Sequence, residues 1–295
     1  MFKGSIVAIV TPFHNGKVDE KKLRDLIEFQ IKNGSSGIVP CGTTGESATL
    51  NFVEHEKVIA ITVEQAKKRV PVIAGTGSNS TEEAVTLTKH AAKIGASASL
   101  QVSPYYNRPT QRGLYQHFKA IADSVDIPIM LYNIASRTGV NIEPETIARL
   151  AGDCKNITAV KEASGNLNQM QSIKALCGDE FDLLSGDDSL TLPVLSIGGT
   201  GVVSVVANIV PGDVAKLVSE FQNGNINRAQ EINYKLAPLV KAIFIETNPI
   251  PVKTSMGLLG MCEPGLRLPM SSMSPENVEK LKKALKDYGL KGVKI

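Results

Sequence analysis

Eight short apolar runs alternate along the chain with amphipathic stretches of helical length. Most of the runs are continuously apolar, which is typical of parallel strands that are buried on both faces. The runs cover residues 5–10, 37–41, 71–75, 98–102, 128–133, 157–161, 181–185 and 201–206.

The stretches between these runs carry signals for helix starts and stops. Residues 19–33 place Leu23, Leu26 and Ile27 at helical spacing, and a glycine follows as a stop signal. Ser80 and Glu83 resemble a capping box, and Pro144 lies near an expected helix start.

Together these units predict an α/β fold, a (β/α)8 TIM barrel over residues 1–224. A doubly wound sheet is the alternative, but it needs a crevice at a switch point and usually has fewer units. Residues 225–295 predict three helices, over 225–246, 252–259 and 275–288. We therefore expect a catalytic barrel followed by a C-terminal helical domain that docks on it.

Polar, glycine-rich segments follow seven of the predicted strands. In a TIM barrel the chemistry gathers at the carboxyl ends of the strands, so these segments predict one catalytic face. They are GTTGES (42–47), GTGSNS (75–80), SPYYN (103–107), YNIASRTG (132–139), KEASGN (161–166), SGDDS (185–189) and SVVAN (204–208).

Lys161 stands where a buried strand gives way to a polar loop. Burial disfavours the charged ammonium form of a lysine, so a lysine in this position can act as a nucleophile. The alternative is a lysine that ends the strand and reaches water, and Lys161 alone does not decide between them.

Other strand-end residues favour the nucleophile. The amides and hydroxyls of the GTTGES turn can hold a small carboxylate, although the glycines also suit an ordinary turn. Arg137 can grip a carboxylate, and Tyr132 and Tyr106 can pass protons. Asp187 and Asp188 suggest a capped helix start rather than a metal pair. The set predicts Schiff-base chemistry on a 2-oxo acid.

Composition excludes several other classes of protein. The 295 residues carry a net charge of only +3, with no tryptophan and no basic stretch, so nothing indicates a nucleic-acid partner. No apolar stretch is as long as a membrane span and no secretory signal is visible, so we expect a cytoplasmic protein without a membrane partner. The four cysteines form no CxxC pair and the four histidines no HExxH motif. We expect no metal and no cofactor.

The motifs GTTGES, SPYYNRP (103–109), YNIASRTG and KEASGN resemble those of the 4-hydroxy-tetrahydrodipicolinate synthases, also called dihydrodipicolinate synthases. This family belongs to the pyruvate-dependent class I aldolases and lyases. The resemblance extends from VAIVTPF (7–13) to NPIPVK (248–253) and LRLPM (266–270), nearly the whole chain.

The resemblance implies a catalytic role for four residues. Lys161 would form the Schiff base with pyruvate, and Tyr132 would be the general acid and base. Thr43 would link Tyr132 to Tyr106 in a proton relay, with Tyr106 supplied by a neighbouring subunit. A homotetramer built as a dimer of dimers is the family expectation.

The resemblance also implies how the substrates bind. Thr44 and its turn would hold the pyruvate carboxylate, with the backbone at Gly186 and Val203 lining the pocket. Arg137 would bind the carboxylate of L-aspartate 4-semialdehyde, and the product would feed diaminopimelate and lysine synthesis. Ala135 stands where the family often has proline. Alanine lacks the backbone restriction of proline, so the segment that positions Arg137 is less tightly fixed.

Many bacterial members are inhibited by lysine bound at a subunit interface. The residues here that match that pocket are Ser47, Ala48, His55, Asn79, Glu83 and Tyr105. Phe52 stands where inhibited members often have histidine, and it cannot hydrogen-bond to the inhibitor, so we expect weaker inhibition. The alternative is that these residues only build a subunit contact.

Two other functions are compatible with parts of the pattern. An aldolase that cleaves a 2-keto-3-deoxy sugar acid would share the lysine and the GxxGE turn, but such enzymes typically lack the SRTG arginine. A ligand-binding barrel without turnover would not need Lys161, Tyr132, Thr43 and Tyr106 together.

Overall fold

Eight parallel strands form the core of the computed structural model, which describes residues 2–293. They are hydrogen-bonded in the order β4-β1-β10-β9-β8-β7-β6-β5. A parallel bridge between Ile38 and Val72 joins β4 to the segment that leads into β5, so the two edges of the sheet meet. This confirms the (β/α)8 barrel. The strands are β1 (Gly4–Ala8), β4 (Gly37–Val39), β5 (Ile73–Gly75), β6 (Ala98–Val102), β7 (Ile129–Asn133), β8 (Ile157–Glu162), β9 (Asp182–Ser185) and β10 (Gly201–Ser204).

The side chains of these strands divide between two apolar layers. Met130 and Ala159 belong to the cluster inside the barrel, whereas Leu131 and Val160 pack in the layer toward the helices. Successive side chains of a strand point to opposite faces, so Lys161 points to the same side as Ala159. The continuously apolar runs of the sequence are explained by this burial on both faces.

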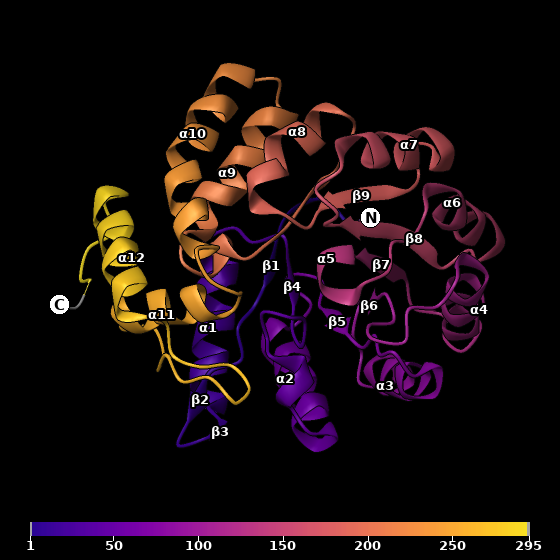
Figure 1. Cartoon of the computed structure of the whole chain (residues 1–295), viewed down its shortest axis with the longest axis horizontal. Coiled ribbons are helices and arrows are strands. Elements are labelled where there is room, and N and C mark those ends of the chain that lie inside the picture. The colour runs from indigo at the N-terminus through magenta and orange to yellow at the C-terminus, as the bar shows by residue number, and fades with distance from the viewer. Residues whose placement is uncertain (1, 294–295) are drawn as a thin grey trace.

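Helices cover the outside of the barrel (Figure 1). They are α1 (Glu20–Lys32), α2 (Phe52–Ala66), α3 (Thr81–Lys93), α4 (Gln111–Ala122), α6 (Pro144–Asp153), α7 (Leu167–Cys177), α8 (Thr191–Ser196) and α9 (Pro211–Gln222). Pro144 lies in the first turn of α6, as predicted. Ser80 caps α3 by accepting from the amide of Glu83, but the Glu83 carboxylate binds the Ser78 hydroxyl instead. The complete capping box forms at the start of α2, between Asn51 and Glu54.

Several short elements escaped the sequence pattern because they are too short to show a period. A two-stranded hairpin of β2 (Phe13–His14) and β3 (Lys17–Val18) follows β1. The four-residue helix α5 (Ala135–Thr138) follows β7. Three 3-10 helices lie at strand ends: η1 (Ser47–Thr49), η2 (Asp188–Leu190) and η3 (Val206–Asn208). Strand β8 also continues one residue beyond the predicted end at Lys161.

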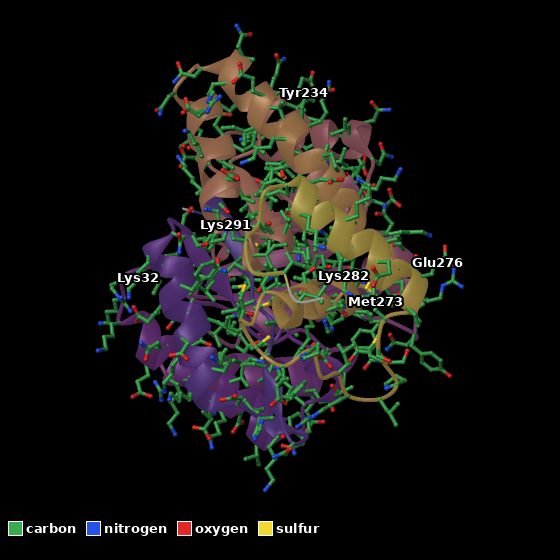
Figure 2. The ribbon with its side chains drawn as sticks, turned by 90° about the vertical axis from the view of Figure 1, so that its left-hand side faces the viewer. Lys32, Tyr234, Met273, Glu276, Lys282 and Lys291 are labelled. Carbon is green, nitrogen blue, oxygen red and sulfur yellow. The ribbon has the colours of Figure 1, made fainter. Side chains whose placement is uncertain are left out.

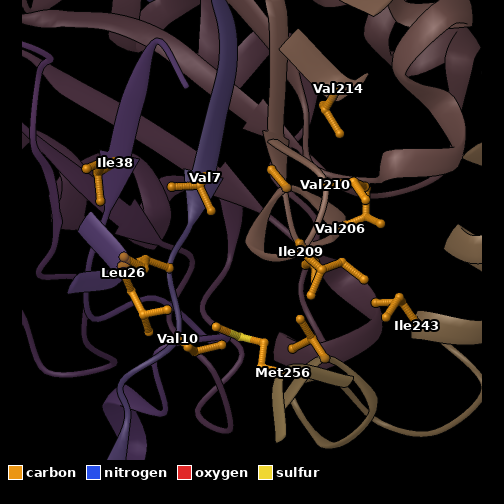
Figure 3. Close-up of a cluster of buried hydrophobic side chains, with 14 of the residues drawn as sticks. Val7, Val10, Leu26, Ile38, Val206, Ile209, Val210, Val214, Ile243 and Met256 are labelled. Carbon is orange, nitrogen blue, oxygen red and sulfur yellow. The ribbon is translucent and has the colours of Figure 1, made fainter. Parts of the chain in front are cut away.

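Three helices follow the barrel, as predicted: α10 (Ile226–Ile243), α11 (Ile250–Leu258) and α12 (Pro275–Asp287). Figure 1 places them on one side of the barrel, and Figure 2 shows α12, with Glu276 and Lys282, across that side. Their apolar side chains join the outer core of the barrel. In Figure 3, Ile243 and Met256 lie in one cluster with Val10 and Ile209.

The division into domains 1–224 and 225–295 remains a prediction, since the core is continuous between them. Residue 1 and residues 294–295, which these predicted domains include, lie outside the described chain. Within residues 2–293, no helix combines the length and the apolar character needed to cross a bilayer.

Candidate active site

Lys161 and Tyr132 lie side by side at the carboxyl end of the barrel. They pair across β7 and β8 in the parallel register, and both are buried, Lys161 with 6% of its surface exposed. The Lys161 Nζ lies 4.1 Å from the centroid of the Tyr132 ring. Lys161 therefore does not end the strand in open water, which was the alternative reading of the sequence.

Gly186 makes room beside the Lys161 stem. A Cβ at this position would lie 2.7 Å from the Cβ of Ala163 and 3.1 Å from the Cε of Lys161. The first distance is shorter than real Cβ contacts, so any side chain here would displace its neighbours. The Gly186 amide also donates to the carbonyl of Glu162, at 2.7 Å, which fixes the loop after β9 against the end of β8.

Glu162 holds the end of β8 in place from the face of the sheet opposite to Lys161. It is fully buried, and its carboxylate accepts from Asn133 Nδ2 at 2.9 Å, Gln169 Nε2 at 2.9 Å and the Ser164 amide at 2.6 Å. Because Asn133 follows Tyr132 on β7, this contact ties together the strand ends that carry Lys161 and Tyr132. Sequence reasoning missed Glu162; its one signal was a second charged residue next to Lys161 in an apolar run.

The turn over residues 42–47 follows β4 and is held by its own backbone. The amides of Gly45, Glu46 and Ser47 donate back to the carbonyls of Gly42 and Thr43 at 3.1–3.3 Å. Glycine suits position 45, because a Cβ there would lie 3.0 Å from the Cys41 nitrogen and would force the backbone to shift slightly.

The turn leaves donors unused. In the described chain no hydrogen bond uses the backbone N–H groups of Thr43 and Thr44. Free amides of this kind attract an anion, as expected for a carboxylate site.

Arg137 and Thr44 meet at a residue that the sequence analysis did not single out, Asn248. The Arg137 Nη2 donates to the backbone carbonyl of Asn248 at 3.1 Å. The Asn248 Nδ2 donates to the Thr44 Oγ1 at 3.0 Å. The guanidinium that follows Ala135 in α5 is thus held by a contact from outside the barrel, although its side chain is largely exposed.

A cavity of about 570 Å³ opens over this end of the barrel. Arg137, Ala163 and Gly186 lie on its barrel side. Leu236 and Lys241 of α10, and Phe244 directly after this helix, close the other side, among further residues. Val203, by contrast, lies in the apolar interior of the barrel on β10. The cavity thus brings Arg137 and Gly186 together, while Val203 is buried and is not one of its lining residues.

The two aspartates after β9 accept hydrogen bonds from backbone amides of the loops, in agreement with the predicted capped helix start. Asp187 caps η2 by accepting from the Ser189 amide at 2.8 Å. Asp188 accepts from the amides of Val205 and Val206, at 2.9 and 3.2 Å, and from the Ser204 hydroxyl. Burial raises the pKa of the Asp188 carboxyl, while these hydrogen bonds act in the opposite direction.

Tyr106 and Thr43 are not assembled into a relay within one chain. Tyr106 is 90% exposed and adopts a left-handed backbone conformation, with φ of 72°. Among residues 2–293, no hydrogen bond joins Thr43 to either Tyr132 or Tyr106.

The residues matched to the lysine pocket fall into two groups. Asn79 donates to the carbonyl of Tyr105 at 3.0 Å, and Glu83 accepts from Ser78 at 2.6 Å, so one group surrounds the start of α3. Ser47 and Ala48 lie in η1, and His55 lies in α2. His55 is buried, and burial lowers its pKa, so this imidazole does not line an open pocket within one chain.

Across residues 2–293, no three His, Cys, Asp or Glu side chains gather closely enough to bind a metal ion. The four cysteines are unpaired, and burial raises the pKa of the Cys41 thiol beside the turn.

A buried lysine beside a tyrosine, free amides and an arginine, all at the carboxyl ends of barrel strands, define an enzyme of the (β/α)8 class. Comparisons with known proteins agree. The model of the dihydrodipicolinate synthetase family matches residues 1–288. The chain is 61% identical, over 99% of its length and all of its relative's, to the 4-hydroxy-tetrahydrodipicolinate synthase of Syntrophus aciditrophicus. The chain therefore belongs to the dihydrodipicolinate synthetase family, and it is a class I lyase.

Solved structures give the same result. The dihydrodipicolinate synthase of Aquifex aeolicus superposes with a TM-score of 0.98 at 54% identity, covering all of both chains. The enzyme of Cyanidioschyzon merolae, solved with lysine bound, has a TM-score of 0.95 at 43% identity over 98% of this chain and 99% of its own. The chloride-inhibited enzyme of Acinetobacter baumannii, complexed with pyruvate, has a TM-score of 0.96 at 43% identity over 98% and 100%.

Proposed function

We propose that this chain is a 4-hydroxy-tetrahydrodipicolinate synthase that condenses pyruvate with L-aspartate 4-semialdehyde on Lys161. The observation that carries the proposal is the buried Lys161 amine over the Tyr132 ring, with Gly186 leaving space beside its stem. Family membership supports the same reaction. The product would enter the diaminopimelate route to lysine.

The first half of the reaction activates pyruvate. The neutral amine of Lys161 adds to the C2 carbonyl, and water leaves to give an iminium ion. The iminium withdraws electrons, so a C3 proton can leave and an enamine forms. Tyr132, whose ring centroid lies 4.1 Å from the Lys161 Nζ, would move protons at the nitrogen and at the leaving oxygen. Thr44 and the free amides of its turn would hold the carboxylate.

The second half builds the product. The enamine carbon attacks the aldehyde carbon, and the aldehyde oxygen takes up a proton to become a hydroxyl. The amino group of the semialdehyde then adds to the iminium carbon and displaces Lys161, which closes the ring and frees the enzyme. Arg137 would hold the semialdehyde carboxylate, since its guanidinium lines the cavity beside Gly186. Val203 and Gly186 would offer backbone groups to pyruvate.

Borohydride trapping tests the first half directly. Reduction in the presence of pyruvate should attach the pyruvate carbon skeleton to the peptide that contains Lys161, as read by mass spectrometry. Lys161→Met should abolish the adduct, whereas the control Lys155→Met should keep it. An unmodified Lys161 peptide in the wild-type chain would refute the proposal. Turnover with aspartate semialdehyde rather than 2-keto-3-deoxy sugar acids would then separate the synthase from a sugar-acid aldolase.

We further propose a homotetramer, built as a dimer of dimers in the cytoplasm, in which Tyr106 completes the relay of a neighbouring subunit through Thr43. The exposure of Tyr106 supports this arrangement, because a phenol that serves a proton relay must leave bulk water. Light scattering of the purified chain would test the assembly, and a monomer with full activity would contradict it.

Weak feedback inhibition by lysine is the regulatory part of the proposal. The Glu83 carboxylate could pair with an ammonium and Asn79 could bind a carboxylate, with Ser47, Ala48, His55 and Tyr105 around them. Phe52 is 55% exposed and can only pack against the methylene stem. Lysine at millimolar concentrations should lower the rate, and Phe52→His should increase the sensitivity. A flat response to lysine up to its solubility limit would rule this regulation out.

A further inference from the structure

The segment between α10 and α11 reaches back onto the catalytic turn. Asn248 lies in this segment with 6% of its surface exposed. Its side chain contacts Thr44, 204 residues earlier in the chain, and its backbone carbonyl accepts from Arg137. One residue from outside the barrel therefore touches both residues that are proposed to hold substrate carboxylates.

The contact with Thr44 has a defined polarity. An amide nitrogen can only donate, so the Asn248 Nδ2 donates and the Thr44 Oγ1 accepts. A hydroxyl that accepts this bond keeps its own hydrogen free. Within residues 2–293 no hydrogen bond uses the Thr44 hydroxyl as a donor. The hydrogen is therefore available to a further acceptor.

The side-chain oxygen of Asn248 shows that this orientation of the amide costs free energy. The Asn248 Oδ1 is buried and has no hydrogen-bond partner among the described residues. An unpaired buried acceptor is unfavourable, and native structures keep few of them. An apolar side chain of the same shape would remove the unpaired oxygen, but it would also lose the donor to Thr44.

We propose that Asn248 is a positioning residue for pyruvate: its amide sets the Thr44 hydroxyl as a donor toward the substrate carboxylate. The inference rests on the proposed function, in which Thr44 and the free amides of Thr43 and Thr44 hold that carboxylate. Replacing the amide leaves the Thr44 hydroxyl free to turn away, so pyruvate binds more weakly. The Arg137 contact uses the backbone carbonyl, so it survives a change of the side chain.

The test is a split between the Michaelis constants of the two substrates. Asn248→Leu should raise the KM for pyruvate about tenfold, the range expected for a hydrogen bond to a charged group. The KM for aspartate semialdehyde and kcat should change much less. Half-saturation of borohydride trapping by pyruvate alone should shift by the same factor. An exposed control, Asn227→Leu, should change none of these values.

A second variant keeps the shape and reverses the polarity. In Asn248→Asp, the carboxylate accepts a hydrogen bond from the Thr44 hydroxyl. The hydroxyl hydrogen is then no longer free to bind pyruvate, so pyruvate binding should weaken at least as much as in Asn248→Leu. Thr44→Val supplies the epistasis test: if Asn248 acts through Thr44, adding Asn248→Leu to Thr44→Val should have no further effect on the pyruvate KM.

Three results would overturn the inference: an unchanged pyruvate KM in Asn248→Leu, equal rises for both substrates, or additive effects of the Asn248 and Thr44 changes. Equal rises would indicate a collapsed segment rather than an oriented hydroxyl. A wild-type chain that forms no pyruvate adduct would refute the proposed function itself, and the inference with it.

Discussion

Replacing Lys253 by methionine should destabilise this protein far more than any surface charge change. Lys253 lies in α11 and is completely buried. Its Nζ donates to Glu46 Oε1 at 2.6 Å and to the Thr11 carbonyl at 3.0 Å, and it lies 4.3 Å from the centroid of the Phe13 ring. Burial lowers the pKa of Lys253, while the Glu46 carboxylate acts in the opposite direction.

The size of the destabilisation follows from the Glu46 carboxylate, which stays buried after it has lost the Lys253 ammonium. Without the ammonium, the Glu46 carboxylate is buried with the Arg267 amide, at 3.1 Å, as its remaining donor in the described chain. Breaking a buried ion pair from one side costs about 3–5 kcal/mol. For a chain of this size that corresponds to a fall in Tm of roughly 5–8 °C.

The assay is denaturant unfolding at pH 7.5, with the protein concentration held constant because the proposed assembly would make stability depend on concentration. The double variant Glu46→Gln with Lys253→Met removes both charges and keeps an acceptor for the Arg267 amide, so it should recover most of the loss. Lys283→Met, which breaks an exposed pair with Asp287, should cost less than about 1 kcal/mol. The reasoning is wrong if Lys253→Met costs under 1 kcal/mol, or if the double variant is as unstable as the single one.

Three further predictions test other contacts. Burial lowers the pKa of His117 to about 4, so as the pH falls below about 6.5 this imidazole takes up a proton in the unfolded chain before it does so in the folded chain. Denaturant unfolding of the wild-type chain should therefore show a loss of about 3 kcal/mol of stability by pH 4. His117→Asn should show a shallower loss. Gly186→Ala should displace Lys161 and slow adduct trapping about 100-fold, whereas Gly152→Ala, where a Cβ meets nothing within 4 Å, should not slow it. Mixed assemblies of the inactive variants Tyr106→Phe and Lys161→Met should regain activity if Tyr106 serves the neighbouring subunit; no recovery in verified hybrids would contradict that role.

The barrel could be predicted from the sequence because its signals are local and repeated. A parallel strand that is buried on both faces needs a continuous apolar run, and eight such runs stand out from the helices between them. The strand ends were predicted less well. Strand β1 ends at Ala8 although the apolar run continues to residue 10, because hydrophobicity alone does not mark where ladder hydrogen bonds stop.

The candidate site was predictable in part, because the carboxyl ends of parallel barrel strands meet in space. Lys161 and Tyr132 therefore come together without any knowledge of distances, and Thr44 and Arg137 follow the carboxyl ends of β4 and β7. The role of Tyr106 is harder to predict. Its side chain is exposed, so a single chain does not show which surface would cover it in an assembly.

Thus the sequence by itself determined the architecture and the chemical inventory of the strand ends, since both depend on periodicity and on residue type. Only the tertiary structure decided how these residues are held. Asn248 and Lys253 contact the catalytic turn across 204 and 207 residues of chain. The motif NPIPVK contains both residues, but it does not show what they contact, because their environment is created by the docking of α11 against the barrel.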